Sequence, residues 1–302
     1  MRIGIDIGGS AVKIGALVGD RTIVARSRLP ISREIGFEAL IGEISRACAD
    51  IERLAATRAT AIGVACPGYC DRASGRIIDG AANVPCLRGR NPALALTRSL
   101  DRPVVCGNDG VAAALGEMML GAGRSLRSFA MVTLGTGVGG AVVLDGRIIT
   151  GPNGQPPELG AIVLELADPP GTLERYASSQ GFVEAYRGAG GEDGTASGAD
   201  IAARAADDRV AEAAAEVVAQ RIAQACGGLV NALNLEACLL GGGLVQACPS
   251  LPVRVARHLP RYTWPFLMRG LRVMASETGA DAGLIGAACL ISQEARRAVA
   301  LS

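Results

Sequence analysis

The stretch IGIDIGGSAVKIG, residues 3–15, decides the fold of this chain, because one apolar strand enters a glycine turn and another leaves it. The same arrangement returns in MVTLGTGVGGAVVL at residues 131–144. Between them lies VVCGND at 104–109, where an Asn-Asp pair follows an apolar strand. Two glycine turns that can cradle phosphate, and one carboxylate that can take up a proton, are typical of a phosphotransferase.

The composition is that of a globular protein with a sizeable core. The chain has 302 residues, 49% of them hydrophobic and 20% charged, which is enough for one large or two moderate domains. The net charge of +1 gives no electrostatic reason to expect a nucleic acid or a membrane as partner. The apolar runs are too short to span a bilayer, and no signal peptide is recognised. We therefore expect a cytoplasmic protein.

The cysteines and the single histidine restrict the possible chemistry. Nine scattered cysteines, none in a Cys-x-x-Cys pair, predict buried thiols in a reducing compartment rather than a disulfide framework. Because His258 is the only histidine, multi-histidine metal sites are impossible, and a histidine-based triad would have to use a residue with no motif around it. We expect His258 to lie at the surface or at a helix end.

Apolar periodicity predicts an α/β fold. Three consecutive antiparallel strands are expected at 2–7, 11–18 and 22–29, followed by an amphipathic helix that begins at Phe37. The second half repeats the strands around the second glycine turn and adds a helix over 174–186. The repeated order indicates two similar α/β lobes that hold a ligand in the cleft between them.

The two glycine turns suit phosphate for a physical reason. Without a Cβ the backbone reaches positive φ, and successive N–H groups can converge on an anion. Either turn alone is more often an ordinary hairpin. Asp6 favours a functional interpretation of the first turn, because a carboxylate in an apolar strand is costly unless it has a use, such as binding a hydrated Mg²⁺ that bridges to ATP phosphates. In the second turn Thr136 supplies a hydroxyl.

Asn108 and Asp109 stand where an apolar strand gives way to a helix. The structural alternative is that Asp109 caps the helix, which would stabilise it by about 1 kcal/mol. The functional alternative is that Asp109 is the general base that removes a proton from a sugar hydroxyl, a role that contributes roughly 10²- to 10⁴-fold in rate. The isolation of the pair favours function. Glu158 and Glu174 are further polar candidates, although spacing alone predicts surface residues.

Together these motifs resemble the ROK family (repressors, open reading frames and kinases) of the sugar-kinase and actin-like ATPase superfamily. The matching segments run in one order along almost the whole chain, and the main ones are DIGGS at 6–10, PG at 67–68, NDGVAAALGE at 108–117, LGTGVGG at 134–140, ELG at 158–160 and LGGG at 240–243. The resemblance implies two actin-like (ribonuclease H-like) lobes with a ligand cleft between them. We expect an N-terminal lobe at 1–116, closed by a C-terminal helix at 286–302, and a C-terminal lobe at 117–285.

The resemblance also implies roles for individual residues in an ATP-dependent sugar kinase of the glucokinase type. Asp109 would be the catalytic base for transfer of the γ-phosphoryl group to a hexose 6-hydroxyl. The other substrate contacts would be Gly68, Asn83, Asn108, Glu158 and Glu174. The residues expected to hold Mg-ATP are Asp6, Gly8, Gly9, Ser10, Lys13, Thr133, Gly135, Thr136, Gly137, Gly241, Gly242 and Gly243. Asp6 would reach Mg²⁺ through water or phosphate.

The chain departs from the family pattern at the zinc motif. Many members read Glu-Leu-Gly-His, but Ala161 stands at the histidine position, and residues 165–171 lack the cysteines that supply the remaining zinc ligands. We therefore expect no zinc site. Losing one contact to a substrate hydroxyl can alter discrimination strongly. The expected acceptors are glucose, an amino sugar, an N-acetylhexosamine or a cyclitol.

Other functions within the family remain as alternatives. A repressor carries a helix-turn-helix segment ahead of the first glycine turn, whereas that turn begins by residue 8 here, and the charge lacks a basic DNA footprint. A non-catalytic sugar sensor is the main alternative, motivated by Ala161 and the missing zinc ligands. Polyphosphate in place of ATP also stays open. A homodimer is expected from the resemblance alone.

Overall fold

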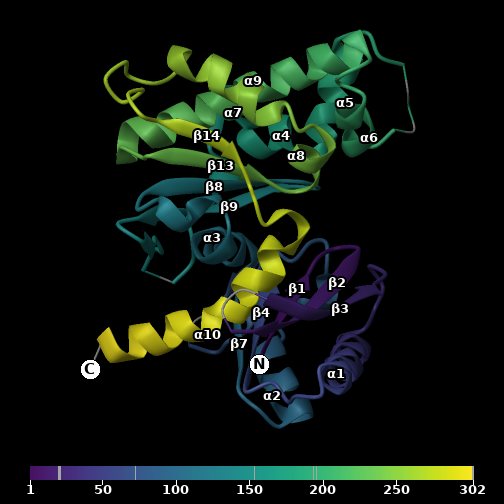
Figure 1. Ribbon diagram of the computed structural model, residues 1–302. Coiled ribbons are helices and arrows are strands. Elements are labelled where there is room, and N and C mark those ends of the chain that lie inside the picture. Colours follow the sequence, from purple (N-terminus) through teal and green to yellow (C-terminus); the bar gives the residue numbers. More distant parts are fainter. Residues whose placement is uncertain (20–21, 72, 153, 193, 195, 301–302) are drawn as a thin grey trace. The chain divides into compact units, whose positions relative to one another are not determined.

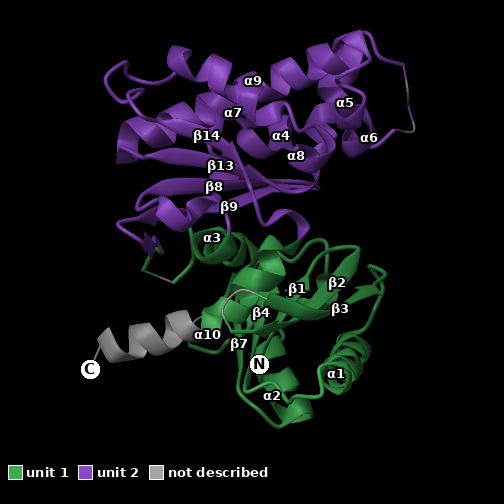
Figure 2. Cartoon of the chain, viewed as in Figure 1, with its two compact units in different colours: residues 1–120, 150–156, 281–302 green, residues 121–149, 157–280 purple. Residues whose placement is uncertain are grey.

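The computed structural model describes residues 1–19, 22–71, 73–152, 154–192, 194 and 196–300, without the side chains of 292–300. The chain divides into two compact units (Figure 2). Unit 1 consists of residues 1–120, 150–156 and 281–302, and unit 2 of residues 121–149 and 157–280. Each unit contains one five-stranded mixed sheet. The prediction of an α/β fold with two similar lobes is therefore confirmed.

Unit 1 is built on a sheet of order β3-β2-β1-β4-β7 (Figure 1). Its strands are β1 (Arg2–Ile7), β2 (Ala11–Val18), β3 (Thr22–Pro30), β4 (Ala61–Cys66) and β7 (Val104–Asn108), and a short hairpin of β5 (Tyr69–Cys70) and β6 (Ile77–Asp79) follows β4. Its helices are α1 (Phe37–Leu54), α2 (Pro92–Leu100), α3 (Asp109–Leu120) and α10 (Ala282–Ala300). β1 pairs antiparallel with β2 and parallel with β4, which pairs parallel with β7. The three predicted N-terminal strands and the helix from Phe37 are confirmed.

The two faces of this sheet differ because side chains alternate along each strand. On β1, Ile3, Ile5 and Ile7 enter the apolar core that α1 and α2 cover. The intervening Gly4 lies against α10, where a Cβ would be 1.8 Å from the carbonyl oxygen of Leu284. The strand thus presents bulky apolar side chains to one helical layer and, at Gly4, bare backbone to the other.

Helix α10 docks on the sheet through backbone contacts. A Cβ on Gly63 of β4 would lie 1.7 Å from the carbonyl oxygen of Ala287. A Cβ on Gly286 of α10 itself would lie 1.6 Å from the carbonyl oxygen of Ala112 in α3. Only glycine fits at these positions, so the helix lies closer to the sheet and to α3 than side chains would allow. The predicted closing helix at 286–302 is described as far as residue 300.

Unit 2 repeats the sheet in the order β10-β9-β8-β13-β14. Its strands are β8 (Phe129–Leu134), β9 (Val138–Leu144), β10 (Arg147–Ile148), β13 (Ala237–Gly241) and β14 (Arg272–Ala275), with a separate hairpin of β11 (Val163–Glu165) and β12 (Gly171–Thr172). Its helices are α4 (Leu173–Ala177), α5 (Ser179–Gly188), α6 (Gly198–Ala203), α7 (Arg209–Leu233), α8 (Gly243–Ala247) and α9 (Leu251–His258). The buried face of α7 forms the centre of the core of this unit.

Two helix predictions had different outcomes. The single helix expected over 174–186 is two helices, because the chain is extended at Ser178 and the Ser178 hydroxyl accepts a hydrogen bond from the Gly181 amide to cap α5. His258 ends α9, as predicted, and its ring nitrogen lies 2.8 Å from a Glu216 carboxylate oxygen. In the part of the chain that the structure describes, no helix combines the length and apolarity needed to cross a bilayer.

Candidate active site

The first glycine turn joins β1 to β2 in unit 1. The Gly8 amide donates to the carbonyl oxygen of Ala11 at 3.0 Å. Neither Gly8 nor Gly9 has a positive φ, so the expectation that this turn needs glycine for a positive φ is wrong. The physical reason at Gly9 is close approach, because a Cβ there would lie 2.8 Å from the Cβ of Asn83. The turn and the exposed Asn83 are thus packed together.

Asp6 lies beside this turn on the α10 face of β1. A Cβ on Gly283 would be 2.6 Å from Asp6 Oδ2, so the helix backbone lies against the carboxylate. Lys13, opposite Asp6 on β2, places Nζ 3.8 Å from the same oxygen. Burial raises the pKa of Asp6, and the charge of Lys13 only partly offsets this effect. Because burial penalises the charged carboxylate, Asp6 is suited to a further cation.

The Asn-Asp pair ends β7 and begins α3. Asn108 Oδ1 accepts hydrogen bonds from the amides of Gly110 at 2.9 Å and Val111 at 3.2 Å, so Asn108 supplies the helix-capping bonds. Asp109 is the first residue of α3 and has an exposed side chain, whose Oδ1 also accepts from the Gly110 amide at 2.8 Å. Asn108, rather than Asp109, therefore supplies the helix cap that was the structural alternative for Asp109.

Gly68 is tied to the same pair. Asn108 Nδ2 donates to the carbonyl oxygen of Gly68 at 3.4 Å. Gly68 has a φ of +89°, and a Cβ there would lie 2.2 Å from the carbonyl oxygen of Asp79, so glycine is required on both counts. Unit 1 therefore brings together all of its predicted substrate residues except Asn83 by direct contact. Asn83 lies instead against Gly9 of the first glycine turn.

The second glycine turn lies in unit 2 between β8 and β9. The Gly135 amide donates to the carbonyl oxygen of Gly137 at 3.0 Å, and the carbonyl oxygen of Gly135 accepts from the Ser179 amide at 2.7 Å. Thr133 is half-buried near the end of β8, and Thr136 is exposed at the tip of the turn. Gly135 and Gly137 lack positive φ, whereas Gly140, which ends the same glycine segment, has a φ of +152°, so the conformational argument holds only at Gly140.

Glu174 is fixed against this turn. Glu174 Oε2 accepts a hydrogen bond from the Val138 amide at 2.9 Å, and a Cβ on Gly137 would lie 2.6 Å from the same oxygen. The exposed Glu158 immediately precedes a short 3₁₀ helix at 159–161, and its side chain makes no capping bond there. Both glutamates are exposed, as their spacing predicted.

The third glycine segment ends β13 and begins α8. Gly242 has a φ of +91°, and a Cβ there would lie 2.3 Å from the carbonyl oxygen of Leu134. Here glycine is required by both its dihedral angle and its packing. Because Leu134 precedes the second glycine turn, Gly241, Gly242 and Gly243 are held beside that turn.

Comparison with known proteins places the chain in a family. The ROK family sequence profile matches residues 2–294. The chain belongs to the ROK family. It is 30% identical to a glucokinase of Halalkalibacterium halodurans, over 97% of this chain and 95% of the relative, and 28% identical to an N-acetyl-D-glucosamine kinase of Escherichia coli O6:H1, over 96% and 99%. The crystal structure of the ROK hexokinase from Thermus thermophilus aligns with a TM-score of 0.79 and 28% identity, covering 98% of this chain and 99% of that one. The predicted resemblance is confirmed.

This ROK protein holds the segment before Glu174 with a polar clamp. Glu165, at the end of β11, accepts a hydrogen bond from the Tyr176 hydroxyl at 2.6 Å and lies 3.3 Å from an Arg221 guanidinium nitrogen. The guanidinium also lies 4.3 Å from the centre of the Tyr176 ring. The hydrogen bond from Tyr176 and the charge of Arg221 hold the pKa of Glu165 below its usual range. The clamp joins the β11–β12 hairpin to α4 and α7.

The clamp occupies the stretch in which the sequence lacked the cysteines of the family. Among the residues that the structure describes, no three His, Cys, Asp or Glu side chains are placed to share a metal ion. Ala161 is exposed at the end of the 3₁₀ helix. Sequence reasoning did not find Tyr176 or Arg221, because an isolated tyrosine and a helical arginine carry no motif and meet only in the folded unit.

Proposed function

We propose that this protein transfers the γ-phosphoryl group of ATP to the 6-hydroxyl of a hexose or hexose analogue, with Asp109 as the general base. Membership of the ROK family, and relatives that are a glucokinase and an N-acetyl-D-glucosamine kinase, support a sugar kinase. The observation that carries the role of Asp109 is the capping geometry. Because Asn108 supplies the bonds that cap α3, helix capping does not account for an exposed aspartate at this position.

In the proposed reaction the Asp109 carboxylate accepts the proton of the sugar hydroxyl as its oxygen attacks the γ-phosphorus. Glu174, and Glu158 with it, accept hydrogen bonds from other ring hydroxyls, while Asn83 and Gly68 complete the sugar contacts. Asn108 contributes a further hydroxyl contact, and its hydrogen bonds to Gly68 and Gly110 link that loop to the start of α3. Catalysis by this arrangement is mostly positioning and electrostatics.

For the nucleotide, we propose that the glycine turns bind the phosphates and that Gly241, Gly242 and Gly243 lie along the adenosine. Asp6 fits a hydrated Mg²⁺, because its carboxylate is 19% exposed and the charge of Lys13 only partly offsets the cost of its burial. When bound, Mg²⁺ would neutralise charge on the ATP phosphates. The nine free cysteines fit a reducing cytoplasmic location. A homodimer remains a prediction.

The test is ADP release with Mg-ATP across glucose, mannose, glucosamine, N-acetylglucosamine, N-acetylmannosamine and cyclitols. Asp109→Asn is expected to lower kcat by roughly 10²- to 10⁴-fold on the accepted sugar. Asp101→Asn is the matched control, because Asp101 is an exposed aspartate just before β7 whose φ of +50° asparagine tolerates. Full turnover by Asp109→Asn would refute the base. Sugar binding in calorimetry without turnover on any sugar would favour the sensor alternative.

A further inference from the structure

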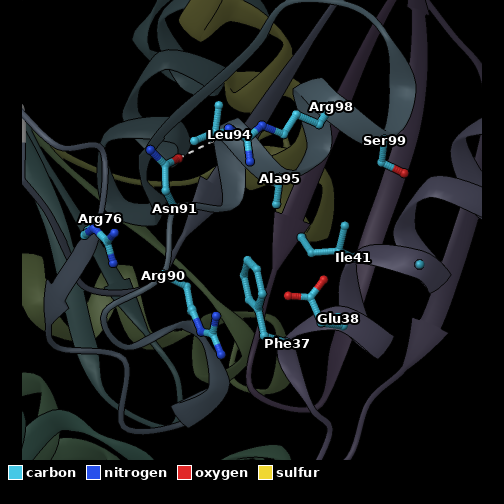
Figure 3. A pocket seen from close by; sticks show the side chains of 11 residues that line it. Phe37, Glu38, Ile41, Arg76, Arg90, Asn91, Leu94, Ala95, Arg98 and Ser99 are labelled. Atoms are coloured by element: carbon cyan, nitrogen blue, oxygen red, sulfur yellow. Dashed lines mark hydrogen bonds between the residues drawn. The ribbon is translucent and has the colours of Figure 1, made fainter.

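A groove in unit 1 lies away from the residues assigned above. It opens between the start of α1, the start of α2 and the segment 76–90, and its volume is about 590 Å³ (Figure 3). Sites for small molecules usually have volumes of about 300 to 1,000 Å³. The groove is large enough for a metabolite, and it needs a chemical explanation because its lining is strongly charged.

Three arginines surround this opening. Figure 3 shows Arg76 and Arg90 on the loop side and Arg98 on α2. Within the described residues none of the three guanidinium groups forms an ion pair, and Arg76 donates only to the carbonyl oxygen of Gly89, at 2.7 Å. By contrast, Arg102 in the same unit pairs with Glu52. Because the whole chain carries a net charge of only +1, this concentration of positive charge is local.

The walls of the groove are fixed by other contacts. The Arg90 guanidinium lies 5.3 Å from the centre of the Phe37 ring, which is 8% exposed, so a buried aromatic face supports this charge. Asn91 accepts a hydrogen bond from the Leu94 amide at 2.9 Å and donates to the carbonyl oxygen of Ser74 at 2.9 Å. These contacts hold the loop and α2 in place before any ligand binds.

The groove also carries groups suited to hydroxyls. The Glu38 carboxylate lies on its α1 side (Figure 3), and Ser99, on α2, exchanges a hydrogen bond with Ser45 of α1 at 2.8 Å. A carboxylate in a groove that three arginines line disfavours a uniformly charged polyanion. It suits a ligand that has one anionic end and a neutral, hydroxylated body.

We propose that this groove binds a phosphate monoester of a small polyol. Guanidinium groups match the geometry and charge of a phosphate dianion. The Glu38 carboxylate would accept hydrogen bonds from the hydroxyls of the attached polyol, and the Ser99 hydroxyl would accept from them or donate to them. Such an ester has two sources. One is the sugar phosphate that the proposed kinase would release, and the other is an ester made by a different reaction, such as glycerol 3-phosphate.

Binding there would act on the candidate active site through one loop. The amide of Ile77 donates to the carbonyl oxygen of Arg90 at 2.8 Å, and the amide of Gly89 donates to that of Ile77 at 2.7 Å, so Arg76 and Arg90 flank the closed base of the loop. The same loop carries Asn83 between these ends. An ester that joins the two arginines would therefore stiffen the loop and alter the KM for sugar. This consequence rests on the proposed function, whereas binding itself does not.

The test is calorimetry on the full chain with glucose 6-phosphate, glycerol 3-phosphate and inorganic phosphate as separate probes. Loss of one charge-assisted hydrogen bond corresponds to about a ten- to hundredfold weaker affinity, which we expect for Arg98→Gln and for Arg76→Gln. Arg88→Gln is the matched control, because Arg88 is exposed on the same loop but outside the groove. Its affinity should equal that of the unaltered protein. Tighter binding of glucose 6-phosphate would identify the product of the proposed kinase as the source, and tighter binding of glycerol 3-phosphate would identify an ester made by a different reaction.

Three outcomes would overturn the proposal or its parts. Absence of ester binding at millimolar concentration, or an equal loss in Arg88→Gln, would refute the groove as a site. Ester binding that Arg98→Gln and Arg76→Gln leave unchanged would assign the ester to the candidate active site and also refute it. Groove binding with no change in the KM for sugar would refute the coupling alone. Failure of the proposed kinase would appear separately, as no turnover on any sugar, and would leave the calorimetry unaffected.

Discussion

Replacement of Gly137 by alanine tests how the second glycine turn and the proposed sugar contact depend on each other. The new Cβ would lie 2.6 Å from Glu174 Oε2, which accepts a hydrogen bond from the Val138 amide at 2.9 Å. Gly137 lacks a positive φ, so alanine adds no backbone strain. The long glutamate side chain is then expected to move away, because it yields more easily than the strand.

The substitution is expected to lower kcat/KM for the sugar and to change Tm little. A hydrogen bond to a charged group contributes about 1.5 to 3 kcal/mol, so loss of the Glu174 bond to a sugar hydroxyl should lower kcat/KM for the sugar about ten- to hundredfold. The assay is steady-state kinetics against the accepted sugar at saturating ATP, with Tm measured beside it. Because Glu174 is exposed, Tm should change little.

Gly135→Ala is the contrasting variant in the same turn. A Cβ on Gly135 would meet nothing within 4 Å, so it should leave the sugar kinetics alone and act, if anywhere, on the KM for ATP. In a Glu174→Ala background, Gly137→Ala should cost nothing more, because the group it displaces is already gone. An unchanged kcat/KM in the single variant, or the same loss in both backgrounds, would refute the reasoning.

Three further predictions follow from the packing and charges. Asp6→Asn should raise Tm at pH 7 while lowering activity. Burial raises the pKa of Asp6, so ionisation of its carboxylate lowers stability once the pH rises above the value of the unfolded chain. A gain in Tm over the unaltered protein that persists undiminished at pH 3 would contradict this sign. Gly63→Ala should lower the free energy of unfolding by about 1 to 3 kcal/mol or more, whereas Gly228→Ala, exposed in α7 with open space around it, should raise it by about 1 kcal/mol in denaturant titrations. Tyr176→Phe should return the pKa of Glu165 toward its ordinary value in an NMR titration, and an unchanged pKa would exclude their hydrogen bond.

The sequence predicted the sheets well because their signals are local. Alternating or continuous apolar runs bounded by glycine specify strands without reference to distant residues, and the strands at 2–7 and 11–18 match β1 and β2. The prediction of one helix over 174–186 was wrong because it, too, used only local apolar spacing. Its apolar residues keep helical spacing across Ser178, and only the hydrogen bond that the Gly181 amide donates to the Ser178 hydroxyl marks the start of a second helix.

The sequence named the residues of the candidate site, whose roles stay predictions, but it did not give the packing reasons for the glycines among them. At Gly9 and Gly137 the atoms that a Cβ would meet belong to distant parts of the chain, Asn83 and Glu174. Close approach of this kind has no local signature. The sequence likewise did not tell that Asn108 caps the helix and Asp109 is an exposed carboxylate, because asparagine and aspartate cap helices equally well.

The backbone contacts of α10 with Gly4 and Gly63 have a consequence for the order in which the chain can fold during synthesis. Residues 282–290 complete the α10 face of the sheet in unit 1, yet the ribosome makes them after every residue of unit 2. A nascent chain released only as far as β14 has all the strands of both sheets, but Gly4 and Gly63 then face water or a chaperone instead of a helix backbone. Unit 2 is therefore free to fold while the chain is still being made. Unit 1, which carries Asp6 and Asp109, has to wait for its last helix.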